Sequence, residues 1–234
     1  MGKDKLKRFA ENEGFKCLFQ PEFEEIFRKD YKLKGKWHSE VFRNSNPIVL
    51  ELGCGRGEYT VELARRHPYI NFMGIDIKGA RLWRGAKSAT EESLTNVAFV
   101  RCRIEFIEYL FGPEEVSEIW ITFADPQINR ENKRLTGTLF LARYRKFLVP
   151  DGTIHLKTDS LYLHNYTMAM AELNGLEITE RNKNIYEESG KANEVLAIKT
   201  HYEECYLSKG VAITYLAFKL DPKKKLIEPD KGSY

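Results

Sequence analysis

The sequence predicts an α/β fold in which a doubly wound, mostly parallel sheet of seven strands carries helices on both faces. The first observation behind this prediction is that, from Pro47 onwards, apolar runs of strand length alternate with helical patterns. The second is composition, since 234 residues with 42% hydrophobic and 30% charged side chains are typical of a globular protein. A chain of this length buries about 70% of its unfolded surface and needs no disulfide or metal to fold.

The predicted elements follow one another in a regular order. Apolar or alternating runs predict strands at residues 47–53, 71–76, 96–101, 118–125, 152–158, 176–181 and 212–220. Helical patterns occupy residues 58–68, 79–94, 104–111, 139–148 and 160–175. Strands alternating with helices form βαβ units, and the arrangement is Rossmann-like. The predicted regions are a charged arm or cap (1–45), the α/β domain (46–220) and a polar tail (221–234).

Charge and cysteine usage exclude several classes of protein. The net charge of +3 permits an anionic partner without requiring one. No apolar run approaches the roughly 18 residues of a membrane span, so no membrane association is expected. The four cysteines and five histidines lack metal-ligand spacing, which argues against a metal site and against a disulfide framework. We therefore expect a cytoplasmic protein without metal, and the sequence leaves monomer and homodimer both open.

The first predicted strand ends in an acid followed by three glycines. Glu51 precedes Gly53, Gly55 and Gly57 in the run ELGCGRG. Glycines let the backbone turn tightly and approach a ligand before the next helix begins. The spacing differs from the G-x-G-x-x-G of dinucleotide binders, and an acid here suits the ammonium group of a methionine moiety better than a pyrophosphate. The alternative is a plain glycine turn without a ligand.

The second predicted strand ends in Asp76, 19 residues after Gly57. An acid at this point can accept hydrogen bonds from both ribose hydroxyls of a nucleoside. The alternative is an N-cap for the following helix. Together, Glu51, the glycines and Asp76 indicate a ligand with a ribose, no pyrophosphate and a cationic amino-acid tail. We therefore predict S-adenosyl-L-methionine as the cofactor.

The fourth predicted strand ends in Asp125-Pro126, and seven of the next nine residues are amide or charged. Proline lacks a backbone N–H and stops the strand there. Because such sheets bind ligands beyond the carboxyl ends of their strands, the Asp125 carboxylate is expected to face the group that receives the methyl. A simple Asp-Pro turn is the alternative.

In this order, the motifs resemble those of the tRNA (guanine-N7)-methyltransferase family of bacterial type. The match runs from about residue 47 to residue 220 and rests on GxGxG, GIDIKGAR, FADP followed by KRL, LKTD and TxxE. The arm KLKRFAENEGFKCLFQP is also similar. The resemblance implies the S-adenosylmethionine-dependent methyltransferase type of the Rossmann-like fold. It also implies tRNA as the partner and N7 of the variable-loop guanine (position 46 in standard tRNA numbering) as the methyl acceptor.

The resemblance assigns roles to individual residues. Those that match the family's cofactor pocket are Glu51, Gly53, Gly55, Gly57, Asp76, Arg103, Ile104 and Asp125, with Asp125 also at the reaction centre. Those that match its substrate contacts are Asn129, Arg130, Lys133, Arg134, Asp159, Thr200 and Glu203. The stretch DPQINRENKRL carries fewer cations than the family's usual DPWPK run, and Arg103 stands where an acid usually meets adenine. Arginine has no acceptor, so another group must accept from the adenine amino group.

Three of these substrate residues also have purely structural interpretations. Asp159 is equally well placed to cap the helix predicted after it. Thr200 and Glu203 form the T-x-x-E pattern of a capping box. The tail DPKKKLIEPDKGSY is expected to be solvated, with its three adjacent lysines as a less favoured phosphate contact.

Methylation of guanine N7 sets modest chemical demands, because N7 carries a lone pair and no proton. The protein has to align N7 with the methyl carbon and the sulfur, and to stabilise a purine that becomes cationic. Asp125 can do both by accepting hydrogen bonds from guanine N1–H and N2–H. An NAD-dependent dehydrogenase shares the architecture but is disfavoured by Glu51 and by the missing G-x-G-x-x-G. A non-catalytic RNA-binding module that keeps the fold is the third hypothesis, because the stretch DPQINRENKRL carries few cations.

Overall fold

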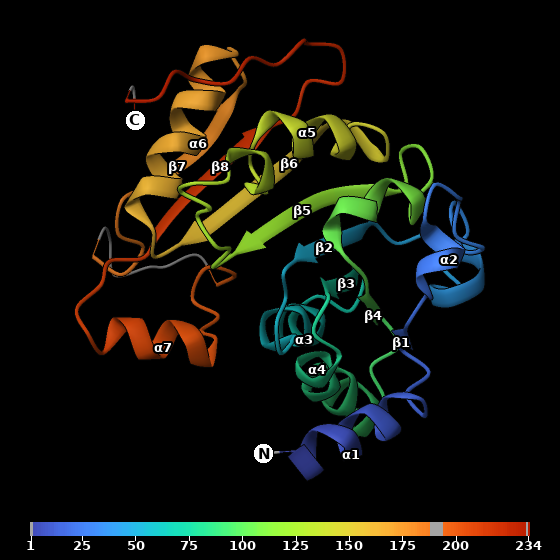
Figure 1. The fold of residues 1–234 in the computed structure, drawn as a ribbon. Helices are drawn as coiled ribbons and strands as arrows, with labels where there is room; N and C mark the ends of the chain where they lie inside the picture. Colours follow the sequence, from blue (N-terminus) through green and yellow to red (C-terminus); the bar gives the residue numbers. More distant parts are fainter. Residues whose placement is uncertain (1, 188–193, 233) are drawn as a thin grey trace.

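The computed structural model describes residues 2–187, 194–232 and 234 and is built on one eight-stranded sheet (Figure 1). The strands are β1 (Leu18–Phe19), β2 (Ile48–Leu52), β3 (Asn71–Asp76), β4 (Val97–Arg101), β5 (Val116–Thr122), β6 (Leu148–Thr158), β7 (Ile178–Asn182) and β8 (Thr214–Lys219). Their spatial order is β1-β4-β3-β2-β5-β6-β8-β7. The first six strands pair in parallel, and β8 runs antiparallel to both β6 and β7. The predicted doubly wound, mostly parallel sheet is confirmed.

The sheet has one strand more than the seven predicted. The predicted strands correspond to β2 through β8, and the additional strand, β1, comes from the region predicted as an arm. Its residues Leu18 and Phe19 pair with Phe99 and Val100 of β4. A strand of two residues is too short to show the period-two pattern by which strands are predicted. The predicted count is therefore wrong by this one edge strand.

Helices cover both faces of the sheet, with α3 and α4 on one side and α5 and α6 on the other (Figure 1). The α-helices are α1 (Gly2–Asn12), α2 (Phe23–Ile26), α3 (Glu58–Arg66), α4 (Gly79–Glu91), α5 (Thr138–Tyr144), α6 (Leu161–Leu173) and α7 (His201–Leu207). The other helical segments are the π-helix η1 (Trp37–Phe42) and the 3-10 helices η2 (Ile104–Tyr109) and η3 (Glu131–Lys133). The helix predicted at 104–111 is thus only the 3-10 helix η2. Among the described residues, no helix is both long and apolar enough to cross a membrane.

Two hydrophobic clusters, one on each face, hold the layers together. Alternate residues of β2 point to opposite faces, so Ile48 and Leu50 join one cluster and Val49 the other. The cluster beneath α5 and α6 also contains Trp37, which is fully buried. The region predicted as an arm therefore shares the core of the α/β sheet. This double-sided burial fixes the sheet as a rigid platform for the loops at its carboxyl rim.

Candidate active site

The carboxyl ends of β2, β3, β5 and β6 meet at one rim of the sheet, where two adjoining cavities open. The larger cavity, of about 510 Å³, lies beyond the ends of β3, β4 and β5. The smaller cavity, of about 310 Å³, lies between the end of β2 and the start of α7. Gly53 and Phe123 line both cavities. The predicted site residues that line one or both are Glu51, Gly53, Gly55, Asp76, Arg103, Ile104, Asp125, Arg130, Lys133 and Thr200.

Asp76 is the last residue of β3 and lines the larger cavity. Its Oδ2 accepts a hydrogen bond from the backbone N–H of Gly55 (3.0 Å), and its Oδ1 accepts one from the backbone N–H of Lys78 (2.7 Å). The N-cap position of α4 is Lys78, without a side-chain cap, so Asp76 does not serve as the N-cap. Each Asp76 oxygen retains acceptor capacity, which matches a pair of hydroxyl donors.

The glycines of the loop after β2 divide into two roles. Gly53 and Gly55 have φ angles of 76° and 57°, and a Cβ on Gly53 would meet no heavy atom of the described residues within 4 Å. The backbone is therefore open to a ligand at Gly53. At Gly57, by contrast, a Cβ would lie 2.5 Å from the ring of Phe99. Gly57 lines neither cavity and serves the close packing of α3 on the sheet, which replaces the cofactor contact predicted for it.

Glu51 is buried at the base of the smaller cavity. Its Oε2 accepts hydrogen bonds from the backbone N–H (3.0 Å) and the hydroxyl of Thr60, and its Oε1 accepts one from Thr122 Oγ1 (2.5 Å). Burial raises the pKa of Glu51 to about 7, and the negative charge of Asp76 adds to this rise. The carboxyl group is thus held in one position and carries only part of a charge at neutral pH. A cation placed in the smaller cavity would favour the charged form.

Asp125 follows β5 and is exposed at the edge of the larger cavity. Its Oδ1 accepts a hydrogen bond from the backbone N–H of Gln127 (3.0 Å), so an Asx turn is present as the Asp-Pro alternative suggested. Phe123 and Gln127 on either side have φ angles of 50° and 49°, which non-glycine residues seldom adopt. The carboxylate is therefore held by a specific turn and still faces the cavity.

Residues 127–135, the polar ribbon that follows Asp125-Pro126, are only partly available to a partner. Asn129 and Arg130 are exposed, and Lys133 forms an ion pair of 2.7 Å with Glu105. Arg134 is only 1% exposed. A phosphate cannot reach a guanidinium that is buried in this way, so the direct substrate contact predicted for Arg134 is wrong in this structure. Its contacts are taken up below.

Asp159 directly follows β6 at the carboxyl rim and lines neither cavity. The cap of α6 is Ser160, whose side chain accepts from the backbone N–H of Leu163 (3.2 Å), so Asp159 does not fill that role. Instead, Asp159 Oδ2 accepts a hydrogen bond from the hydroxyl of Tyr202 (3.4 Å). Asp159 therefore supports Tyr202 of α7, which lines the smaller cavity.

Thr200 and Glu203 form the capping box of α7, as their structural interpretation suggested. Glu203 is fully buried, and its carboxylate binds the ammonium group of Lys157 (2.9 Å) and the hydroxyl of Tyr186 (2.6 Å). Burial lowers the pKa of Lys157 despite this partner. Because Glu203 has no exposed surface, the direct substrate contact predicted for it is replaced by a role in holding α7 against β6.

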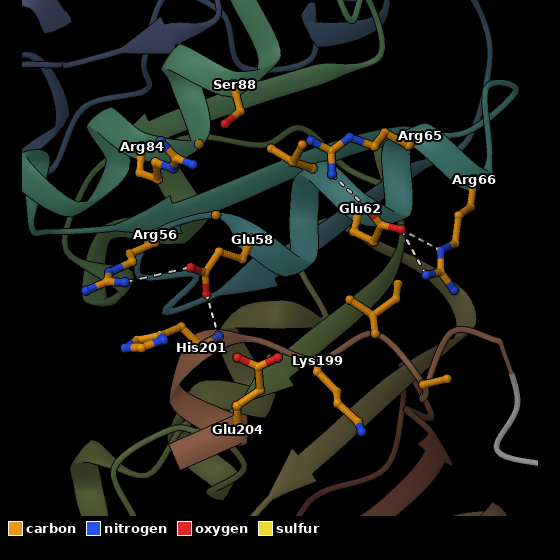
Figure 2. Close-up of a pocket in the computed structure, with 15 residues that line it drawn as sticks. Arg56, Glu58, Glu62, Arg65, Arg66, Arg84, Ser88, Lys199, His201 and Glu204 are labelled. Carbon is orange, nitrogen blue, oxygen red and sulfur yellow. Dashed lines mark hydrogen bonds and ion pairs between the residues drawn. The ribbon is translucent and has the colours of Figure 1, made fainter. Parts of the chain in front are cut away.

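A third cavity, of about 450 Å³, adjoins the site between α3, α4 and the chain before α7 (Figure 2). Its charged side chains largely pair with one another: Glu62 binds both Arg65 (2.7 Å) and Arg66 (2.8 Å). Glu58 accepts from the backbone N–H of His201 (2.9 Å) and so separates this cavity from the smaller one. Neither Asp76 nor Asp125 lines it. The residues predicted to carry the chemistry thus gather in the other two cavities.

Comparisons with known proteins identify the family. A family model described as a putative methyltransferase matches residues 45–216. A tRNA (guanine-N(7)-)-methyltransferase of Christiangramia forsetii is 56% identical over 220 residues, which cover 93% of this chain and 98% of that protein. The chain belongs to the tRNA (guanine-N(7)-)-methyltransferase family. A Bacteroides fragilis protein of the same name is 49% identical over 230 residues, covering 98% of this chain and 91% of the relative.

A solved structure supports the fold of this methyltransferase family member independently. The 16S rRNA methyltransferase KamB matches with a TM-score of 0.61 at 15% identity, covering 81% of this chain and 95% of its own. The chain is an enzyme, and its methyl donor is S-adenosylmethionine. The residues present fit that donor: Asp76 offers two acceptor oxygens, Gly53 opens the backbone, and Glu51 supplies a carboxylate.

Three further lining residues of the methyltransferase were not identified from the sequence. Glu105 lies in the larger cavity, Tyr202 in the smaller one and Phe123 in both. The rings of Phe123 and Tyr202 lie 5.4 Å apart, although 79 positions separate the two residues in the chain. The local signal for Phe123 was its position directly before Ala124-Asp125 at a strand end. No local pattern indicates Glu105, which carries the acceptor oxygens that Arg103 lacks.

Cofactor affinity is expected to depend on pH through Glu51. Because the pKa of Glu51 is about 7 in the free protein, a bound ammonium group must displace its proton at lower pH. The affinity for S-adenosylmethionine should therefore increase, by up to about tenfold per pH unit, from about pH 5.5 to about pH 7. Calorimetric titration across this range measures the effect. In Glu51→Gln the pH dependence should disappear, and an unchanged slope in that variant would assign the titration to another group.

Proposed function

We propose that this enzyme transfers the methyl group of S-adenosylmethionine to N7 of the variable-loop guanine of tRNA. The observation that carries the proposal is the exposed Asp125 carboxylate, fixed by the Gln127 turn at the edge of the cavity that Asp76 also lines. A tRNA is the substrate in the names of the two relatives reported above, which are 56% and 49% identical. The four cysteines are free thiols, which is consistent with the reducing cytoplasm that we propose as its compartment.

Binding of the donor is divided between the two cavities. Asp76, which lines the larger cavity, would accept from the ribose hydroxyls, and Glu51, which lines the smaller one, would receive the ammonium group of the methionine moiety. For the adenine amino group, Glu105 is the nearest acid along the chain to Arg103, and both line the larger cavity. Bound there, S-adenosylmethionine would supply an electrophilic methyl group on a sulfonium sulfur, which leaves as a neutral thioether. The protein therefore has to orient and stabilise the acceptor.

On the acceptor side, Asp125 receives hydrogen bonds from guanine N1–H and N2–H and stabilises the positive charge that the purine gains. The Phe123–Tyr202 pair offers an aromatic surface on which an unstacked base can lie. Asp159, bonded to Tyr202, orients that ring. No proton has to be removed from N7, so the residues at this rim act by alignment and charge.

The decisive test is transfer of labelled methyl groups to unmodified bulk tRNA, followed by nucleoside analysis. We expect the label in 7-methylguanosine. Cofactor binding without any incorporation would instead support a non-catalytic RNA-binding module. Binding of a nicotinamide dinucleotide in place of S-adenosylmethionine would support the dehydrogenase alternative.

Binding of tRNA is expected to weaken with salt, in part through Arg130 and Lys133. Both line the larger cavity and remain outside the buried network of Arg134. The double alanine variant should flatten the slope of log affinity against log salt by roughly 0.9 or less for each phosphate that is no longer neutralised. A matched control is the double alanine variant of Lys146, which is exposed, and Lys219, which is half-buried; both lie near the opposite rim of the sheet. Equal slopes in both variants would place the docking surface elsewhere.

A further inference from the structure

The tail is largely exposed, as predicted, but Ile227, Glu228 and Tyr234 make specific contacts with the α5–α6 region and with Arg134. In Figure 1 the red segment runs beside α6. The side chain of Asn174, just after α6, binds both backbone groups of Ile227: its Nδ2 donates to the carbonyl (2.8 Å) and its Oδ1 accepts from the N–H (2.7 Å). These paired bonds fix the path of the chain at the start of residues 228–232.

Glu228 connects this segment to the start of α5. Its Oε1 accepts from the backbone N–H (2.9 Å) and the hydroxyl (2.7 Å) of Thr138, the first residue of α5. Its Oε2 accepts from the hydroxyl of Tyr166 on α6 (2.6 Å). A single carboxylate therefore joins the tail, α5 and α6 directly beyond the end of the polar ribbon.

Tyr234 completes a cage of three tyrosines around Arg134. The guanidinium carbon lies 4.4 Å from the ring centre of Tyr166, 5.1 Å from that of Tyr162 and 5.7 Å from that of Tyr234. The guanidinium also donates to the hydroxyls of Tyr162 (2.5 Å) and Tyr234 (3.2 Å). A planar cation stacked on aromatic rings and bonded at its edge has little freedom to move.

The same guanidinium holds the loop that follows Asp125. Arg134 Nε donates to the carbonyl of Pro126 (3.3 Å), and Nη2 donates to the carbonyl of Ile128 (3.1 Å). These two carbonyls flank Gln127, whose N–H fixes the Asp125 carboxylate. An unbroken series of contacts thus runs from Tyr234 through Arg134 to the turn that orients Asp125.

We propose that residues 227–232 and Tyr234 form a strap that positions the loop after Asp125, with Tyr234 and Arg134 as the positioning residues. This inference rests on the proposed function in so far as Asp125 orients the acceptor base. The strap lies away from the residues that hold the donor, since neither Arg134 nor Tyr234 lines a donor cavity. Loss of the strap should therefore impair methyl transfer without changing the affinity for S-adenosylmethionine.

The test compares Tyr234→Ala with Tyr234→Phe, which keeps the ring and loses only the hydroxyl. Tyr234→Ala should lower the single-turnover rate of methyl transfer to tRNA by about tenfold to a hundredfold, because displacement of an orienting group is felt strongly at the reacting atoms. Tyr234→Phe should recover most of that rate. Tyr69→Ala, at a tyrosine that is 82% exposed and outside the cage, is the matched control and should keep the wild-type rate.

Hydrogen exchange tests the strap even if tRNA is not the acceptor. The backbone N–H groups of Arg130, Lys133 and Arg134 are bonded within the ribbon and should exchange faster in Tyr234→Ala than in the wild type. Unchanged exchange at these amides would overturn the strap whatever the substrate. A rate loss accompanied by an equal loss of S-adenosylmethionine affinity would also overturn it. Absence of methyl transfer by the wild type would overturn the proposed function alone.

Discussion

Replacement of Asp125 with asparagine is expected to lower the rate of methyl transfer to tRNA while leaving the affinity for S-adenosylmethionine nearly unchanged. Asparagine keeps an oxygen that can accept from the backbone N–H of Gln127 and so preserves the turn. What it loses is the negative charge opposite the purine that becomes cationic. Charge stabilisation of this kind is typically worth about 10²–10³ in rate. Asp125→Ala, which loses the acceptor oxygens as well, should be slower still.

Single-turnover methyl transfer at saturating cofactor distinguishes orientation from proton removal. An amide cannot act as a base, so a general-base role for Asp125 predicts that the asparagine and alanine variants are equally inactive. That result, with tRNA still bound, would contradict the orienting role. Wild-type rates in both variants would show that Asp125 takes no part in the reaction. Calorimetric measurement of cofactor binding in each variant controls for damage to the larger cavity.

Loss of the buried ammonium group of Lys157 is expected to have the largest effect on stability. Lys157 and Glu203 are both fully buried, and Lys157 Nζ also donates to the carbonyls of Leu196 (2.9 Å) and Ile198 (2.8 Å). Lys157→Met leaves the Glu203 carboxylate without its counter-ion. Breaking one side of a buried ion pair typically lowers the free energy of unfolding by about 3–5 kcal/mol. Urea denaturation followed by circular dichroism measures the change.

An exposed ion pair provides the comparison for Lys157. Lys231 binds Glu131 at 3.1 Å, but its side chain is 80% exposed. Lys231→Ala should therefore change the free energy of unfolding by only about 0–1 kcal/mol. The double variant Lys157→Met with Glu203→Leu should recover part of the stability that Lys157→Met loses, because no buried charge remains unpaired. If Lys157→Met is as stable as Lys231→Ala, the buried pair does not hold α7 in place.

Features set by local pattern could be predicted from the sequence, whereas features set by distant partners could not. Asp76 and Asp125 were placed at strand ends because apolar runs stop there, and parallel strands bring their carboxyl ends to one rim. The burial of Glu203 depends on Lys157, 46 positions earlier in the chain. The burial of Arg134 depends on Tyr234, 100 positions later. In the sequence both residues look like accessible charges, because nothing within a few positions marks the side chains that bury them.

The ring of Phe99 links residues that a sequence comparison would treat separately. A Cβ on Gly57, Gly74 or Gly85 would approach this ring to within 2.5–2.7 Å, so α3, β3 and α4 each come close to it through a glycine. Each of these three glycines therefore packs against the same ring. A smaller side chain at position 99 would not by itself make room for alanine, because a Cβ at 74 would also lie 2.8 Å from Cys54 Sγ and one at 85 would lie 2.9 Å from the carbonyl oxygen of Arg56. Position 57, with a φ of 67°, stays glycine for its backbone alone. Across a large alignment, positions 57, 74 and 85 are therefore expected to keep glycine.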